Sequence, residues 1–232
     1  MARALILAAG RGERMRPLTD TRPKPLLAVG GKALIEWQVE RLVAGGFSDL
    51  VVNHSHLGQQ IEEALGSGGR FGARIRYSHE PRALETAGGV AQALALLGNA
   101  PFAVVSGDIY TTFDYALLTP RIASIARDPS AHAAHFVLVD NPPYHREGDM
   151  GLAAGRITRE GPRLTYANIA VYHPALFAGV APGTSLRLFP WAYEFVEAGR
   201  VTGEHYRGTW DNLGTPEQLA ALDRLLARKA SP

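Results

Sequence analysis

Glycines and basic side chains concentrate directly after the first apolar run of the chain. The run covers residues 4–9, and the stretch that follows contains Gly10, Arg11, Gly12, Arg14, Arg16, Arg22 and Lys24. Glycines let backbone amides approach a phosphate closely, and arginine and lysine donate charge-assisted hydrogen bonds to its oxygens. The sequence therefore predicts a polyphosphate-binding loop, although a tight turn explains a lone glycine pair equally well.

Two common phosphate-binding loops do not fit this stretch. A dinucleotide fingerprint requires a third glycine three residues after Gly12, where Met15 stands, and a P-loop requires Gly-Lys followed by Ser or Thr. Prolines from Pro17 to Pro25 also prevent a helix from starting directly after the glycines. The remaining interpretation is a long, cationic loop, stiffened by proline, that wraps the triphosphate of a nucleotide.

Asp108 is the candidate metal ligand. It follows the apolar run 102–106, and open α/β sheets bind ligands at the carboxyl ends of their strands. Mg²⁺ takes oxygen ligands and keeps several water molecules, so one or two protein groups together with phosphates are sufficient. A turn or capping role for Asp108 is the alternative.

An alternation of apolar runs and helical patterns must position these residues. Strands are expected at residues 4–9, 50–53, 75–77, 102–106, 135–140 and 168–172, with a hairpin within 148–161. Helical faces are expected from Ile35 to Val43, from Ala91 to Leu97, and at Leu219, Leu222, Leu225 and Leu226. This alternation predicts an α/β protein with a mainly parallel central sheet and a small antiparallel portion.

Composition narrows the class of protein. The 232 residues are 46% hydrophobic and 20% charged, which indicates a globular domain, and we expect residues 1–232 to form one. The absence of cysteine excludes thiolate metal sites and thiol chemistry. A net charge of +2 gives no reason to expect nucleic-acid binding. The first apolar run is too short for a membrane span or signal peptide, so we expect a cytoplasmic protein without membrane contact. One helical pattern near the end of the sequence leaves little room for a dedicated oligomerisation domain, so we expect a monomer.

Residues 7–26, LAAGRGERMRPLTDTRPKPL, resemble the signature of the sugar-1-phosphate nucleotidyltransferases almost letter for letter. Further similarities are Gly88-Gly89, Ser106-Gly107-Asp108 and residues 210–215. Within the family, segments 51–66, 138–152 and 203–219 are most similar to the N-acetylmuramate-1-phosphate uridylyltransferases of peptidoglycan recycling in the cell wall. The resemblance implies the Rossmann-like, doubly wound nucleotide-diphospho-sugar transferase fold, with the sugar bound by the antiparallel portion.

The resemblance also implies a reaction and a set of site residues. A Mg²⁺-dependent transfer joins a nucleoside triphosphate, UTP in this group, to a sugar 1-phosphate, here N-acetylmuramic acid 1-phosphate, and releases pyrophosphate. Arg14 would hold the triphosphate, and Lys24 would bridge the α-phosphate and the sugar phosphate. Further nucleotide-binding candidates are Ala9, Gly10, Gly12, Glu13, Gly88 and Gly89, and substrate-binding candidates are Ser106, Asn141, Gly148, Asp149 and Asn168. GTP with mannose 1-phosphate, or a non-catalytic nucleotide-sugar sensor, are the alternatives.

Two departures from the family pattern affect the site. Members commonly read Trp-x-Asp-x-Gly-Thr, whereas this chain has Asn212 in the aspartate position and Asp211 one residue earlier. Neighbouring side chains of an extended segment point to opposite faces, so we expect Asn212 to join Asp108 as a weaker, uncharged metal ligand. Some relatives use a second lysine for the sugar phosphate, but no lysine occurs between Lys32 and Lys229. Arg146 and Arg156 are both candidates to replace it.

Overall fold

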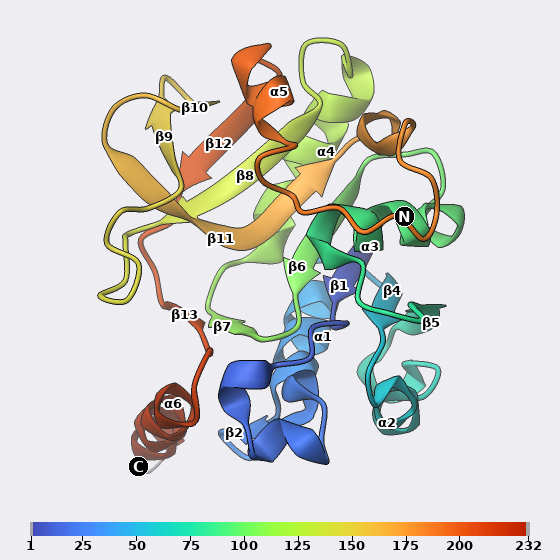
Figure 1. Cartoon of the computed structure of the whole chain (residues 1–232), viewed down its shortest axis with the longest axis vertical. Helices are drawn as coiled ribbons and strands as arrows, with labels where there is room; N and C mark the ends of the chain where they lie inside the picture. Colours follow the sequence, from blue (N-terminus) through green and yellow to red (C-terminus); the bar gives the residue numbers. More distant parts are fainter. Residues whose placement is uncertain (1, 231–232) are drawn as a thin grey trace.

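The computed structural model describes residues 2–230, and a nine-stranded sheet runs through it (Figure 1). The strand order is β5-β4-β1-β6-β11-β8-β12-β10-β9. The strands are β1 (Arg3–Leu7), β4 (Asp49–His54), β5 (Arg74–His79), β6 (Phe102–Ser106), β8 (Ala134–Val139), β9 (Met150–Ala153), β10 (Arg156–Thr158), β11 (Arg163–Tyr172) and β12 (Val201–His205). The α/β class predicted from the sequence is confirmed.

Four parallel strands form the half of the sheet that carries the glycine-rich loop. β1 pairs in parallel with β4 on one side and β6 on the other, and β4 pairs in parallel with β5. Leu7, the last residue of β1, lies in register with Asn53 of β4 and Ser106 of β6. Because parallel strands end at the same edge, the segments that leave β1, β4 and β6 emerge side by side.

The antiparallel portion continues the same sheet. β11 pairs antiparallel with β6 and β8, and β9 and β10 form the hairpin expected within residues 148–161. β11 also pairs with β9, which curls this end of the sheet. The strand expected at 168–172 is the end of the longer β11, whose register shifts between Tyr166 and Ala170. A residue at such a bulge leaves the regular pleat, and here it is Asn168, at φ +57°.

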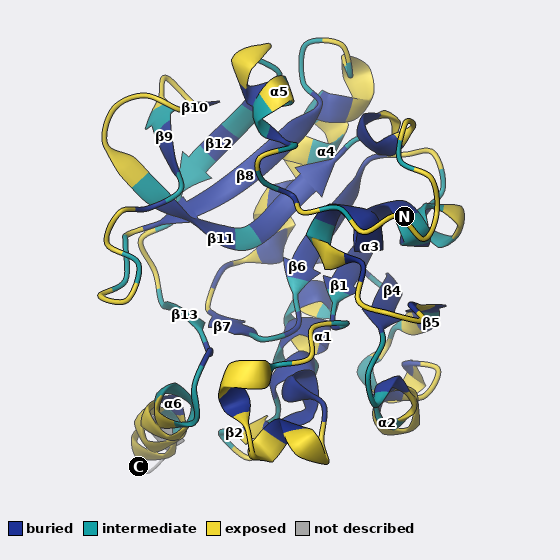
Figure 2. Cartoon of the chain, viewed as in Figure 1, coloured by how far each residue is buried: buried dark blue, intermediate teal, exposed yellow. Residues whose placement is uncertain are grey.

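Helices cover both faces of the sheet, as a doubly wound fold requires. They are α1 (Leu34–Ala44), α2 (Gly58–Leu65), α3 (Glu85–Leu97), α4 (Leu118–Arg127), α5 (Tyr193–Glu197) and α6 (Pro216–Ala230). α1, α2 and α4 pack on the face that carries Ala4 and Ile6, and α3 and α5 pack on the face that carries Leu5. The strands between these layers are largely buried (Figure 2). This alternation of β1 side chains is the period of two expected for a strand covered on both sides.

α6 lies apart from both layers and packs against the base of the glycine-rich stretch (Figure 1). Leu222 is 4% exposed and contacts a small cluster that contains Met15 and Val29, with Leu219 and Leu226 at its margin. Leu225 is 43% exposed, so its predicted place on the apolar face is wrong, because the cluster is too narrow to cover a fourth leucine. Asp223 accepts a hydrogen bond of 2.8 Å from the Gly30 amide, which connects the helix to the turn at residues 30–31.

Two short strand pairs complete the fold. β2 (Ala28–Val29) pairs with β3 (Lys32–Ala33), and β7 (Ile109–Thr111) pairs antiparallel with β13 (Trp210–Asn212). The second pair places residues 210–212 beside the segment that follows β6. Within residues 2–230, no helix combines the length and the hydropathy that crossing a bilayer demands.

Candidate active site

The glycine-rich loop leaves the carboxyl end of β1 and folds into three short 3₁₀ turns, at Glu13–Met15, Leu18–Asp20 and Lys24–Leu26. Gly12 adopts φ +69°, where a side chain is strained. A Cβ at Gly12 would lie 3.0 Å from the Cβ of Lys24 and 3.1 Å from Cγ2 of Thr19. The hydroxyl of Thr19 donates a hydrogen bond of 2.8 Å to the Gly12 carbonyl. The loop therefore closes on itself, and Gly12 packs directly against Lys24.

We expect Gly12→Ala to lower the free energy of unfolding by about 2 kcal/mol, because alanine at a left-handed position is strained. We also expect kcat/KM of the reaction proposed below to fall about tenfold, since the new methyl group displaces Lys24. Chemical denaturation and initial rates measure the two effects. Gly31→Ala is the matched control, because Gly31 is also left-handed, at φ +81°, but has open space around its Cα. Backbone strain should destabilise Gly31→Ala to a similar extent, but its kcat/KM should stay close to that of the wild type. An equal fall of kcat/KM in both variants would contradict a specific role for the Gly12–Lys24 contact.

Lys24 and Asp108 form an ion pair across the base of a cavity. The Lys24 Nζ lies 2.5 Å from Oδ2 of Asp108, and Lys24 is only 7% exposed. The cavity has a volume of about 440 Å³ and is lined by Leu7, Ala8, Gly10, Gly12, Glu13, Arg14, Met15, Lys24, Pro25, Asp108 and Gly214. It therefore combines glycine amides, two cations and two carboxylates, which is the composition expected of a site for phosphates and a cation.

A second cavity of about 370 Å³ shares the loop as a wall. Its lining consists of Leu7, Ala9, Gly10, Arg11, Gly12, Glu13, Asn53, Glu80, Ala83, Glu85, Thr86, Ser106 and Asp108. Asn53 and Glu80 are 2% and 1% exposed. Burial raises the pKa of the Glu80 carboxyl above its ordinary value, and hydrogen bonds from Leu84 and Asn53 act against that rise. Such a buried carboxyl beside a cavity is typical of a functional site.

A third cavity of about 450 Å³ opens toward the antiparallel portion. It is lined by Arg14, Glu85, Thr86, Tyr144, His145, Asp149, Thr165, Tyr166, Asn168, Arg187, Leu188, Phe189, Trp210 and Asn212. Arg14 also lines the first cavity, and Glu85 and Thr86 also line the second, so the three share walls. Aromatic rings and fixed polar groups around one hollow are suited to a sugar.

Most of the predicted site residues line these cavities. Arg14, Lys24, Asp108, Gly10, Gly12 and Glu13 line the first, Ala9 and Ser106 the second, and Asp149, Asn168 and Asn212 the third. Asp149 is held in place, because its carboxylate accepts a hydrogen bond of 2.8 Å from the Tyr166 amide and contacts Nε2 of His145 at 3.0 Å. Asn168 is turned out of the pleat by its left-handed backbone. Ser106, predicted to bind substrate, lies beside the phosphate loop.

Gly88 and Gly89 do not line any of the three cavities. Both are buried inside α3, where the Gly88 amide donates a 3.0 Å hydrogen bond to the Leu186 carbonyl. A Cβ at Gly89 would lie 2.7 Å from both Asn53 and Glu80. The structure thus gives these glycines a packing role, and the cavity wall at this point is made by Glu85 and Thr86. A nucleotide contact of Gly88 and Gly89 stays a prediction.

Asn141 and Gly148 do not line the third cavity, and their contact with the sugar stays a prediction. The Asn141 amide donates hydrogen bonds to the carbonyls of Arg146 and Arg163, and its oxygen accepts one from Thr165. Gly148 adopts φ +61°, and a Cβ at this position would lie 2.7 Å from Oδ1 of Asn141. These two residues shape the 141–148 loop, which presents the Tyr144 and His145 that do line the cavity.

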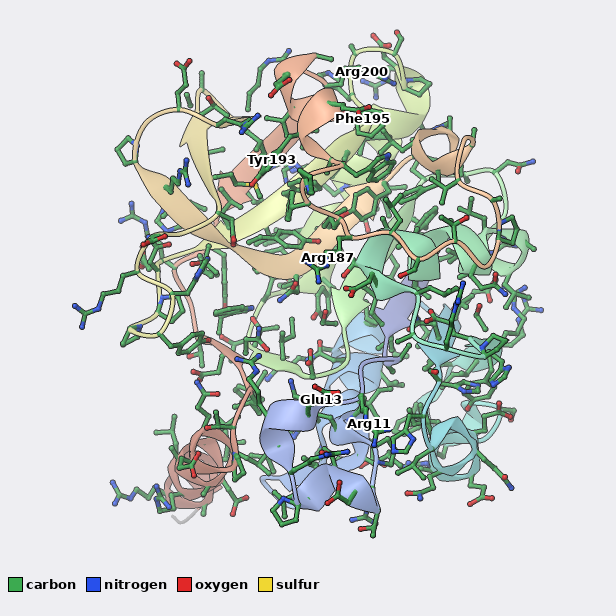
Figure 3. All side chains as sticks on the ribbon, in the orientation of Figure 1. Arg11, Glu13, Arg187, Tyr193, Phe195 and Arg200 are labelled. Atoms are coloured by element: carbon green, nitrogen blue, oxygen red, sulfur yellow. The ribbon has the colours of Figure 1, made fainter. Side chains whose placement is uncertain are left out.

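Apart from Arg14, the arginine that lines the third cavity is neither of the two expected. Arg187 lines this cavity and lies 3.7 Å from Glu85, in the segment beside α3 (Figure 3). Arg146 is exposed outside the cavity, and Arg156 donates to the Gly199 carbonyl instead. Residues 179–192 have no periodicity that could have indicated Arg187. Asn53, also missed, had a signal: a polar residue at the end of a buried strand.

The two predicted Mg²⁺ ligands, Asp108 and Asn212, lie on adjacent segments and line cavities that share Arg14. In β13, Trp210 and Asn212 line the third cavity, whereas Asp211 points elsewhere and burial raises the pKa of its carboxyl. Asn212 pairs in register with Ile109, and the Leu213 amide lies 3.4 Å from the Asp108 carbonyl, so residues 108 and 212 are neighbours. Over residues 2–230, no three His, Cys, Asp or Glu side chains form a metal cluster. One carboxylate and one amide oxygen suit an ion that keeps water and substrate ligands.

Known proteins resemble this chain over nearly its full length. A family model described as nucleotidyl transferase matches residues 3–151. An N-acetylmuramate alpha-1-phosphate uridylyltransferase of Neisseria meningitidis serogroup B is 46% identical over 96% of this chain and 97% of its own. An enzyme of the same name from Caulobacter vibrioides is 34% identical over 97% of this chain and 96% of its own. A mannose-1-phosphate guanylyltransferase catalytic subunit beta of Danio rerio is 30% identical over 94% of this chain and 62% of its own.

Solved structures agree on the fold. A Bacillus anthracis protein provisionally designated a glucose-1-phosphate thymidylyltransferase, in complex with sucrose, superposes with a TM-score of 0.82 at 22% identity, over 97% of this chain and 95% of that one. HddC from Yersinia pseudotuberculosis superposes with a TM-score of 0.77 at 18% identity, over 97% and 99%. At these identities the similarity concerns the fold alone.

Proposed function

The chain belongs to the nucleotidyl transferase family, and from this premise we propose that it transfers a uridylyl group from UTP to N-acetylmuramate 1-phosphate and releases pyrophosphate. The choice of substrates is supported by two relatives of that name that match nearly the whole chain. The observation that carries the chemistry is the Lys24–Asp108 pair at the base of a cavity lined by the glycine-rich loop. The product would serve peptidoglycan recycling.

The transfer needs no nucleophile from the protein. A phosphate oxygen of the sugar attacks the α-phosphorus of UTP, the bond from that phosphorus to the bridging oxygen breaks, and pyrophosphate leaves with those electrons. Positioning and charge neutralisation account for most of the rate in such reactions. Amides of Gly10–Gly12 and the guanidinium of Arg14 are suited to the leaving pyrophosphate. The Lys24 Nζ, held at the base of the cavity, is suited to the charge that develops at the α-phosphate.

The three cavities divide the substrates between them in this proposal. The second cavity, with Glu85 and Thr86 in its wall, would take the base and ribose, and the third would take the sugar against Asp149, Asn168 and Trp210. The sugar phosphate then lies where the first and third cavities meet at Arg14. Arg187 lines the third cavity and would replace the lysine that some relatives use.

Mg²⁺ would be held by Asp108 and Asn212, and when bound it would neutralise phosphate charge. We expect Asn212→Asp to lower the Mg²⁺ concentration for half-maximal turnover several-fold, because a carboxylate adds a charge that the amide lacks. A Mg²⁺ titration of initial rates measures this. Asp211→Asn is the matched control, since it changes the charge one residue away, outside the third cavity. A higher Mg²⁺ requirement in Asn212→Asp would contradict the assignment of Asn212.

A substrate matrix tests the proposed function. Pyrophosphate release is measured with Mg²⁺ for UTP, GTP, CTP and dTTP, each combined with the 1-phosphates of N-acetylmuramic acid, N-acetylglucosamine, glucose and mannose. Release with UTP and the muramic sugar alone is the expected result. Release with GTP and mannose 1-phosphate would retain the mechanism and replace the substrates. Nucleotide-dependent thermal stabilisation without release from any pair would favour a non-catalytic sensor.

A further inference from the structure

A buried chain of hydrogen bonds joins the two walls of the second cavity. It contains Asn53, at the end of β4, and Glu80, which follows β5. Both side chains lie inside the protein, 2% and 1% exposed, at the back of the cavity. The transfer described above assigns neither of them to the reacting phosphates.

Each polar side-chain atom in this series of hydrogen bonds is either a donor or an acceptor. Oδ1 of Asn53 accepts a hydrogen bond of 2.7 Å from the amide of Ala8, which begins the phosphate loop. Nδ2 of Asn53 donates to Oε1 of Glu80 at 2.6 Å. Oε2 of Glu80 accepts a 2.9 Å bond from the amide of Leu84, directly before α3. Two side chains thus connect residue 8 to residue 84 through bonds in which every donor meets an acceptor.

The surroundings leave these side chains little freedom. The Glu80 amide donates a 2.8 Å hydrogen bond to the His54 carbonyl, so the backbone around the pair is also tied. Gly89 of α3 packs against the pair so closely that a Cβ there would lie 2.7 Å from Asn53 Nδ2 and from Glu80 Oε1. Both oxygens of the Glu80 carboxylate are already engaged within the protein. The pair is therefore better suited to holding the cavity walls than to binding a ligand.

We propose that Asn53 and Glu80 are positioning residues that set the spacing between the phosphate loop at Ala8 and the wall formed by residues 84–86. They thereby determine the affinity for the nucleoside triphosphate and leave the affinity for the sugar 1-phosphate unchanged. The inference rests on the proposed function, because it takes the second cavity as the nucleotide site. Loss of a bond in a buried chain leaves a polar group unsatisfied, so the walls separate or shift.

Exchanging the two functional groups tests this inference. In N53D the new carboxylate still accepts from Ala8 but faces the Glu80 carboxylate, and the two repel each other. In E80Q the side-chain NH₂ of the glutamine must face another donor, either Nδ2 of Asn53 or the backbone amide of Leu84. In N53D/E80Q the pattern is complete again, because the glutamine accepts from Leu84 and donates to the new aspartate. The double variant has the same net charge as the wild type.

The readouts are KM for UTP, KM for the sugar 1-phosphate, and UTP binding by calorimetry without the sugar. We expect each single variant to weaken UTP binding and raise KM for UTP about tenfold, the effect of one unsatisfied buried group. The double variant should return to within about threefold of the wild type. KM for the sugar 1-phosphate should remain unchanged throughout. E80Q should therefore weaken UTP binding in the wild type and strengthen it in N53D. Such a change of sign shows that the two side chains interact directly.

Thr202→Val is the matched control for a purely structural effect. Thr202 contacts Nδ1 of buried His135 at 2.9 Å, and neither residue lines any of the three cavities. We expect thermal unfolding to show that Thr202→Val is less stable than the wild type. Its KM for UTP and its KM for the sugar 1-phosphate should both be unchanged.

Three results would overturn the inference: an additive loss in N53D/E80Q, an equal rise of both KM values, or a UTP affinity that does not change. If N53D does not fold, N53D/E80Q must fold and bind UTP more tightly than E80Q, and its failure to do so also overturns the inference. Failure of the proposed function is distinct, because it appears as a wild type that gives no pyrophosphate with UTP and the muramic sugar.

Discussion

Replacement of Lys24 by methionine is expected to lower kcat/KM with UTP and the sugar 1-phosphate about 100- to 1,000-fold. Methionine retains most of the side chain's length and buried apolar contacts but removes the charge that the Lys24 Nζ presents at the base of the first cavity. Loss of one preorganised group that stabilises developing charge typically costs this much in rate. Steady-state kinetics of pyrophosphate release measure the effect, and thermal unfolding shows whether the fold is retained.

Lys32→Met is the matched control for this prediction. Lys32 pairs with Glu40 at 2.6 Å and lines none of the three cavities. We expect its kcat/KM to remain within about twofold of the wild type, since exposed ion pairs contribute little. A loss below about tenfold in Lys24→Met, from folded protein, would show that Lys24 only anchors Asp108 and takes no part in the transfer.

Asp108→Asn is expected to reduce kcat by about 1,000-fold and to abolish saturation by Mg²⁺ at millimolar concentrations. The substitution removes the one carboxylate of the proposed metal site and leaves the buried Lys24 ammonium without its partner. Kinetics across a Mg²⁺ series measure both effects. Binding of Mn²⁺, followed by its electron paramagnetic resonance signal, reports the metal site independently of turnover.

Asp20→Asn provides the control on the same loop, because Asp20 pairs with exposed Arg16 at 3.0 Å away from the three cavities. It should bind Mn²⁺ and turn over like the wild type. The double variant K24M/D108N adds a further check. If Lys24 and Asp108 act as a unit, the double variant loses no more than the more impaired single variant. Wild-type Mn²⁺ binding in Asp108→Asn would contradict its assignment as a metal ligand.

The elements of the parallel half were predictable because their signals are local. The strand Phe102–Ser106 has the predicted bounds, and α1 and α3 contain the helical faces predicted at residues 35–43 and 91–97. The stretch from Gly10 to Pro25 forms no α-helix, as its prolines predicted. In each case a few neighbouring residues suffice, because backbone dihedrals and apolar periodicity are read over one or two turns of chain.

Contacts between distant residues were only partly predictable. Asn141 and Asp149 both carry polar groups suited to a sugar. The side chain of Asn141 forms hydrogen bonds with Arg146, Arg163 and Thr165 inside the loop, whereas Asp149 lines the third cavity. Arg187 reaches the third cavity because residues 184–188 run along α3, where Leu186 exchanges backbone hydrogen bonds with Leu84 and Gly88. Composition alone does not distinguish these cases, since the donors and acceptors are of the same kinds.

The sequence by itself determined the glycine-rich, cationic loop after β1, the alternation of strands and helices, and the substitution of asparagine for aspartate at position 212. Only the tertiary structure decided that Lys24 meets Asp108, that Asn53 joins Ala8 to Glu80, and that Arg187 stands at the third cavity. Periodicity and turn chemistry specify elements and their apolar faces locally. Which polar groups meet depends on strand register and loop paths, which the packing of the whole chain settles.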